Sequence, residues 1–224
     1  MAKSTTGISM ELLGNSIDFE KMVMSALSEK MTVAVSKSIP SIKEGLKDIV
    51  YRAIEGCVEM DELRGGVLGA EFGLTSSIAG EAVQNIATAV SESIFIVHEK
   101  ASSKKGVGGL TVNIQPSDFA NVLNIKGSVV SYYSKKNKEN VNLDWLNWLL
   151  TRGDEVIVSK FRFEPEAGRG RTGMGRMKKG GSWRVSPQYA GTEDDNFITR
   201  ALGSKKLQKK MTSVIHKAIQ KNWK

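Results

Sequence analysis

WLNWLLTRGDEVIVSKFRF at residues 145–163, GRGRTGMGRMKKGG at 168–181 and SWRVSPQYAGTEDDNFITRAL at 182–202 form the stretch that decides the fold. The first segment joins a densely apolar helix to a β-patterned run, and the last joins a second β-patterned run to an apolar helix. A long glycine- and arginine-rich segment lies between them, and no catalytic constellation accompanies it. This order indicates a part of an assembly.

The tryptophan-containing segment 143–150 is too densely apolar for an exposed helix. At least one of its sides should pack on a sheet, and another should meet a partner. Trp145 and Trp148 are therefore candidate interface residues. The alternative, left open by the sequence, is that both belong to the core of a single subunit together with Trp183.

The β-patterned runs should be strands that flank a projecting loop at 164–182. Val156, Val158, Phe161 and Phe163 fit the first strand, and a second strand should start at Trp183. The loop and its flanks carry eight cations against two glutamates, namely Lys160, Arg162, Arg169, Arg171, Arg176, Lys178, Lys179 and Arg184 against Glu164 and Glu166. Contact with a neighbouring subunit, contact with phosphates and a plain solvated loop all fit this composition.

The first ninety residues are predicted to be a flexible arm at 1–15 and a helical region at 16–90. Apolar residues recur at helical spacing on both sides of Pro40, which predicts two amphipathic helices there. A broken helical segment with a turn near Gly73 should follow, and then a helix from about Ser76 to Ala89.

Residues 91–224 should form an α+β core. Alternation predicts a hairpin from 94–97 and 110–114, a short helix near 119–123 capped by Ser117-Asp118, and a strand at 129–133. SKKNKEN from Ser134 should be a solvated loop, and an amphipathic helix rich in lysine should occupy 204–222. The predicted class is α+β, with a small twisted antiparallel sheet packed against helices, the projecting loop and an N-terminal helical extension.

Composition limits the classes of protein that fit. The chain has 224 residues, a formal charge of +8 and one cysteine, so a positively charged protein of a reducing compartment is expected. No apolar run approaches the ~18 residues of a membrane span, and the start lacks the apolar core of a secretory signal. We expect no membrane contact and assembly in the cytoplasm.

Enzymatic interpretations fit the sequence poorly. His98 and His216 lie in segments better explained as a strand end and a helix surface. No cluster has metal-ligand spacing, and Gly168, Gly170 and Gly173 satisfy a bare GxGxxG that no helix follows. The acidic run 193–195 is most simply explained as a helix cap formed with Thr192. We expect no enzyme, no cofactor and no metal.

The order of segments from 143 to 202, followed by the terminal helix, resembles neck and tail-completion proteins of tailed bacteriophages, including a tail-component family. A motif of those proteins, a Gly-Thr pair and a Phe-x-x-Arg-Ala element before the last helix, is matched by Gly191, Thr192, Asn196, Phe197, Arg200 and Ala201. Tyr189-Ala190 departs from the Glu-Phe that related chains often carry. The resemblance covers about residues 60 to 222.

The resemblance implies a structural virion protein that forms a ring, with sixfold symmetry, between the connector and the tail. Connector or adaptor proteins, tail proteins and further copies of the chain would be its partners. The expected subunit-interface residues are Trp145, Trp148, Arg169, Arg171, Arg176, Phe197 and Arg200, and the expected DNA-facing residues are Lys178, Lys179 and Arg184. A tail terminator at the end of the tail tube and a non-specific DNA-binding module are the alternatives.

Overall fold

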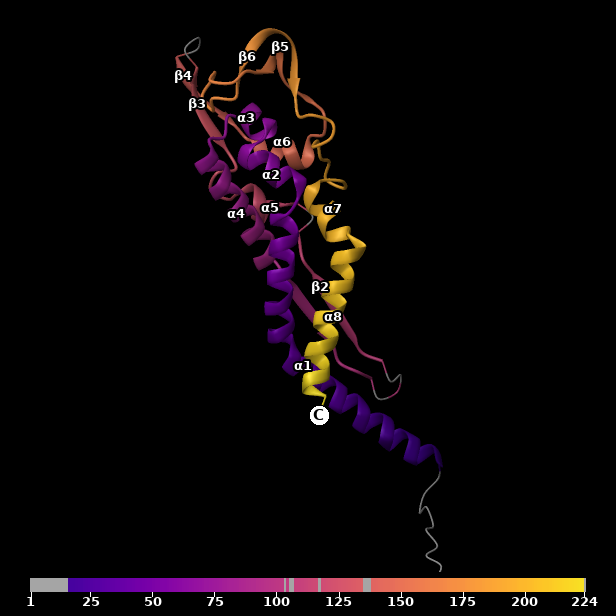
Figure 1. The fold of residues 1–224 in the computed structure, drawn as a ribbon. Coiled ribbons are helices and arrows are strands. Elements are labelled where there is room, and N and C mark those ends of the chain that lie inside the picture. Colours follow the sequence, from indigo (N-terminus) through magenta and orange to yellow (C-terminus); the bar gives the residue numbers. More distant parts are fainter. Residues whose placement is uncertain (1–15, 103, 105–106, 117, 135–137, 224) are drawn as a thin grey trace, which may run out of the picture.

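The computed structural model describes residues 16–102, 104, 107–116, 118–134 and 138–223, so the predicted flexible arm at 1–15 lies outside the described residues. Helices and small antiparallel sheets packed on them make up the described chain, which confirms the α+β class. Figure 1 shows an elongated molecule with one long helix along its length and two of its hairpins gathered at one end. The strands are divided among three separate two-stranded sheets.

The long helix α1 runs without interruption from Ser16 to Glu55, so the prediction of two helices separated at Pro40 was wrong. Pro40 lies on the exposed side of α1. The buried side passes it as one continuous stripe, formed by Ala34, Ser38, Ile42, Leu46, Val50 and Ile54. Because this stripe packs on α4 and α8, tertiary contacts keep the helix whole at a residue that would otherwise favour a break.

Three shorter helices follow, α2 (Val58–Gly65), α3 (Val67–Phe72) and α4 (Ser76–Glu92). The predicted turn near Gly73 is confirmed, because Gly73 ends α3 in the left-handed conformation with φ of +69°. The predicted helix from Ser76 is also confirmed and is slightly longer than expected.

Two hairpins follow the helical region. β1 (Phe95–Glu99) pairs antiparallel with β2 (Gly109–Asn113), as predicted, and β3 (Val130–Ser134) pairs with β4 (Glu139–Leu143). The short helix α5 (Ala120–Leu123) lies between them, with Asp118 Oδ1 accepting a hydrogen bond from the Ala120 amide. Glu139 and Asn140 were predicted to be loop and instead begin β4, because each finds a cross-strand partner in β3.

The third hairpin replaces most of the loop predicted at 164–182. β5 (Val156–Pro165) pairs with β6 (Gly175–Arg184), so the connection between them is limited to residues 166–174. A bulge at Gly180 and Gly181 of β6, opposite Lys160 of β5, shifts the register between Ser159 and Phe161, and all three residues have positive φ. Gly175 permits the pairing, since a Cβ there would lie 2.4 Å from the Phe163 ring.

The core lies where α1 and α4 meet α6 (Trp145–Thr151) and α7 (Phe197–Gly203). The last helix, α8 (Lys205–Asn222), confirms the predicted terminal helix and runs beside α1 (Figure 1). Helix α1 extends past the end of α8, and its first turns therefore lie away from the body of the molecule.

Candidate assembly surfaces

Trp145 is part of the subunit core, contrary to the prediction that it lies at an interface. Its side chain is 0% exposed, and its ring lies 5.6 Å from the ring of Phe72. The indole Nε1 donates a 2.7 Å hydrogen bond to the carbonyl of Gly127. Both halves of the side chain therefore have partners inside the chain, and none of it is left for a neighbour.

Phe197 is also buried, at 1% exposed, so it cannot serve as an interface residue in this conformation. Trp148 is half-buried and packs against the same core, so part of its side chain remains accessible. The sequence correctly indicated that this region is apolar, but its apolar partners lie in the same chain, among them Phe72 of α3 and the shared core.

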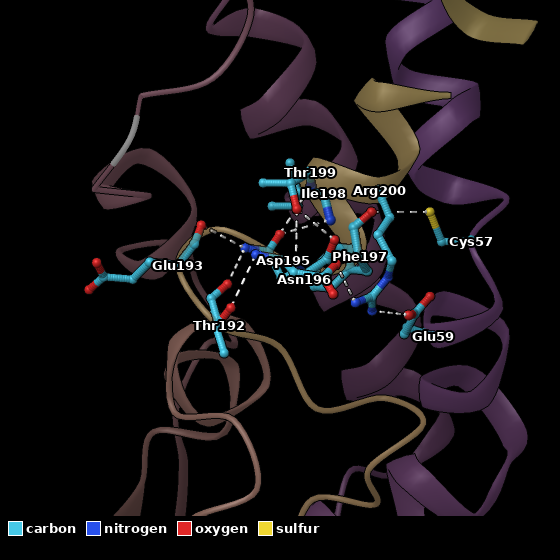
Figure 2. A network of polar contacts seen from close by, with 10 residues as sticks. All are labelled: Cys57, Glu59, Thr192, Glu193, Asp195, Asn196, Phe197, Ile198, Thr199 and Arg200. Atoms are coloured by element: carbon cyan, nitrogen blue, oxygen red, sulfur yellow. Dashed lines mark hydrogen bonds and ion pairs between the residues drawn. The ribbon is translucent and has the colours of Figure 1, made fainter. Parts of the chain in front are cut away.

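The residues that carry the resemblance form a corner that starts α7, shown in Figure 2. Asn196 caps the helix: its Oδ1 accepts hydrogen bonds from the amides of Ile198 and Thr199, at 3.0 and 3.1 Å. Thr199 Oγ1 accepts one in return from the Asn196 amide, at 2.8 Å. The cap was predicted at Thr192, which instead accepts a hydrogen bond from the amide of Asp195. The cap is internal to the fold.

Arg200 joins this corner to α2, as Figure 2 shows. Its Nη2 lies 2.8 Å from Glu59 Oε1 and its Nη1 lies 3.0 Å from Asp195 Oδ1. Glu59 is buried, whereas the Arg200 side chain is 40% exposed. The predicted interface arginine is therefore already engaged within the chain, and Arg200 screens a buried carboxylate.

The predicted interface arginines of the β5–β6 hairpin make contacts within their own chain. Arg169 and Arg176 both lie beside Glu166, with nitrogen–oxygen distances of 3.5 and 3.1 Å. Arg171 extends from the turn toward Gly73 and donates a long 3.5 Å hydrogen bond to the carbonyl of Ser131. All three side chains are exposed, so each remains accessible to a partner.

The three residues predicted to face DNA differ in their surroundings. Lys178 forms an ion pair with Glu164, which holds the pKa of that carboxyl below its usual range, and Arg184 pairs with Asp154 at 3.3 Å. Lys179 is exposed and belongs to none of the ion pairs found in the described ranges. Four of the eight hairpin cations, Arg169, Arg176, Lys178 and Arg184, therefore have acidic partners, whereas Lys160, Arg162, Arg171 and Lys179 belong to none of the ion pairs found in the described ranges.

A cavity of about 610 Å³ lies between this hairpin and α3, a feature that sequence reasoning missed. Its lining is mostly apolar and includes Phe72, Val158, Phe163 and Trp183, with Arg171 and Glu71 at its polar side. Burial raises the pKa of Glu71 to about 7. The nearby indole N–H of Trp183 opposes this shift, although its contact with Glu71 does not meet the distance and angle limits of a hydrogen bond.

Two exposed surfaces lie on helices that the sequence predicted. Residues 18–27 at the start of α1 are all exposed, although they include Phe19, Met22, Val23 and Leu27. The outer side of α8 carries lysines and no carboxylate. Amphipathic periodicity was visible for both helices, but it does not tell whether the apolar side is covered.

The described part of the chain bears on two kinds of chemistry, metal binding and thiol reactivity. It contains no group of three or more His, Cys, Asp or Glu residues that could hold a metal ion. Burial raises the pKa of the Cys57 thiol to about 11, which keeps it protonated at neutral pH. No helix among the described residues has both the length and the apolar character needed to cross a membrane.

No protein-family model, curated protein or solved structure matches this chain. The geometry of the exposed surfaces is therefore what bears on its function.

Proposed function

We propose that this protein is a structural component of the head-to-tail neck of a tailed bacteriophage, and that copies of it assemble into a ring around the DNA passage. Its place would be the virion, with connector and tail proteins as neighbours. The sequence pattern from 143 to 202 suggests the family, while the exposed surfaces suggest where copies meet.

One observation carries the proposal of assembly. Residues 18–27 of α1 project beyond the body as a helix whose side chains are all exposed, with Met22 at 64% and Phe19 at 51%. Leaving a contiguous apolar stripe in water has a free-energy cost of roughly 25 cal/mol per Å² relative to burying it. Such a patch is typical of a surface that meets another protein.

The cavity beside the β5–β6 hairpin supports the same proposal. It lies at the end of the molecule opposite the projecting part of α1, as the positions of these elements in Figure 1 indicate. Two different apolar surfaces at separate places are what a heterologous contact needs, because one face of each copy must meet another face of the next.

Measurement of mass in solution tests the assembly. We expect wild-type protein to form discrete multiples of one chain in analytical ultracentrifugation, and electron micrographs to show closed rings. A variant carrying Phe19→Ser, Met22→Ser and Leu27→Ser should shift toward the single-chain mass while keeping its circular dichroism spectrum.

A matched control uses three equally exposed apolar residues outside the projecting helix, changed to Val58→Ser, Ile78→Ser and Phe95→Ser. This variant should assemble like the wild type. A single-chain mass for the wild type at its highest soluble concentration, with no incorporation into phage particles, would refute the proposal.

A further inference from the structure

The outer side of α8 is the most strongly charged helical surface of the described chain. This helix carries no Asp, Glu or Arg but has six lysines, all of them exposed: Lys205, Lys206, Lys209, Lys210, Lys217 and Lys221. Their combined charge is a large share of the net +8 of the whole protein. No ion pair in the described ranges includes any of the six.

The lysines lie together because of helical periodicity. At about 100° per residue, all six fall within the half of α8 that faces away from its apolar residues. Ser213, His216 and Gln220 lie in the same half, and every one of them is exposed. From Lys206 to Lys221 this row is about 22 Å long, given a rise of 1.5 Å per residue.

The opposite half of α8 is held against α1. Met211, Val214 and Ile215 are partly buried there and pack against the core. Ser38 of α1 donates a 3.0 Å hydrogen bond to the carbonyl of Ala218, and Asn222 donates one of 3.0 Å to the Ser38 hydroxyl. The lysine row is therefore presented on a fixed support, and the apolar half is unavailable to lipid.

We propose that this lysine row is the surface through which the protein contacts the phosphate backbone of duplex DNA without reading its sequence. In the proposed neck this would be the DNA passage, so the proposal rests in part on that function. Duplex DNA carries one charge per about 1.7 Å of its axis, and unpaired lysines gain affinity by displacing the counterions that these charges attract.

Two other partners fit the surface less well. An amphipathic basic helix binds a membrane by inserting its apolar half, and that half of α8 is packed on α1. A protein interface draws its stability from aromatic, arginine or apolar anchors, and the lysine row has none of these, only lysine and small or uncharged polar residues. Hydrated point charges along a helix suit a regular polyanion.

This assignment differs from the expected DNA-facing residues on the hairpin. Lys178 and Arg184 each have a carboxylate partner, and that pairing lowers the net charge they present. The α8 lysines have no such partner in the part of the chain that the structure describes. Comparison of the two surfaces is therefore the sharpest test.

The experiment measures binding of the full chain to a fluorescent random-sequence duplex by anisotropy, over a series of salt concentrations. One variant changes Lys206, Lys210, Lys217 and Lys221 to Gln. A matched variant changes Lys160, Lys178, Lys179 and Arg184 of the hairpin to Gln, so that both lose the same net charge. Thermal unfolding and solution mass are recorded for each protein.

We expect the α8 variant to bind at least about tenfold more weakly, and its plot of log affinity against log salt to be shallower by roughly 3 to 4. The hairpin variant should change both quantities much less. Equal losses in the two variants, or no binding of duplex by the wild type, would overturn the proposal. The mass measurement distinguishes failure of the DNA-binding proposal from failure of the ring proposal. A protein that still assembles but binds no DNA would contradict only the DNA-binding proposal.

Discussion

Helix α6 and the first turns of α1 have similar apolar content and opposite surroundings. In α6, Trp145, Leu146, Leu149 and Leu150 are each 0% exposed, whereas residues 18–27 of α1 are exposed throughout. The difference arises from neighbouring elements: α6 is enclosed by the helical core, and α1 begins beyond the end of α8. Apolar periodicity thus identifies a surface that can be covered, but not whether the same chain covers it.

The largest expected effect on stability concerns Trp145 in the buried helix α6. Trp145→Ala should lower the free energy of unfolding by about 3 to 5 kcal/mol, since it opens a cavity in the core and leaves the Gly127 carbonyl without its donor. Urea denaturation measures this loss. Trp148→Ala, at a half-buried position of the same helix, serves as control and should cost clearly less. Equal, small losses would return Trp145 to the candidate interface residues.

Much of the fold followed from sequence because local rules and tertiary packing agreed. The helix from Ser76 and the terminal helix were predictable from their apolar stripes, and so was the β1–β2 hairpin from its alternation. Strand β6 was not predictable, because glycine and lysine have low strand propensity. Its pairing with β5 and the fit of Gly175 against Phe163 outweigh that propensity, and neither can be read from one segment alone.

The candidate site was harder to predict than the fold. Each charged or aromatic residue chosen for an interface could equally have a partner inside the chain, and a sequence gives no distances. Arg200 illustrates this, because its partner Glu59 lies 141 positions away in the chain. The lysine row was recognisable from composition, but its lack of acidic partners became visible only in three dimensions.

The second-largest expected effect tests whether the contacts of the corner before α7 lie within one subunit, as those of α6 do. Arg200→Ala would leave the buried Glu59 carboxylate without its cation, at a cost of about 2 to 3 kcal/mol once the partial exposure of Arg200 is considered. Adding Glu59→Gln should restore part of this loss, because no buried charge then remains. Denaturation of both proteins gives the two values. If Arg200→Ala leaves the free energy of unfolding unchanged but impairs assembly, Arg200 would instead lie at a subunit contact.

The third effect concerns the cavity, which is intermediate between core and surface. The folded-state pKa of Glu71, about 7, is above its ordinary value of 4.5, so the folded state favours the protonated carboxyl. The contribution of Glu71 to the free energy of unfolding is therefore complete below about pH 4.5 and is lost as the pH rises through 7. We expect stability to be about 1 to 2 kcal/mol lower at about pH 8 than at pH 5, after allowance for solvent screening.

Glu71→Gln provides the control for this pH dependence. An amide has no charge to desolvate, so the variant should lose that part of the pH dependence and be more stable than the wild type at about pH 8. Parallel pH profiles for the two proteins would show that the Glu71 carboxylate is well solvated and that the cavity is open to water.

The smallest expected effect on stability provides the strictest test of the comparison. Leu27→Ala and Leu146→Ala remove the same atoms from two helices, but Leu27 is 48% exposed and Leu146 is 0% exposed. We expect a change within about 0.5 kcal/mol for Leu27→Ala and a loss of about 2 to 5 kcal/mol for Leu146→Ala, in dilute solution where only one chain is present. At high concentration the order of the two effects on assembly should reverse, since only Leu27 is accessible to a neighbour. If Leu27→Ala leaves both stability and association unchanged, the projecting helix is a solvated extension, and the contacts between copies must lie elsewhere.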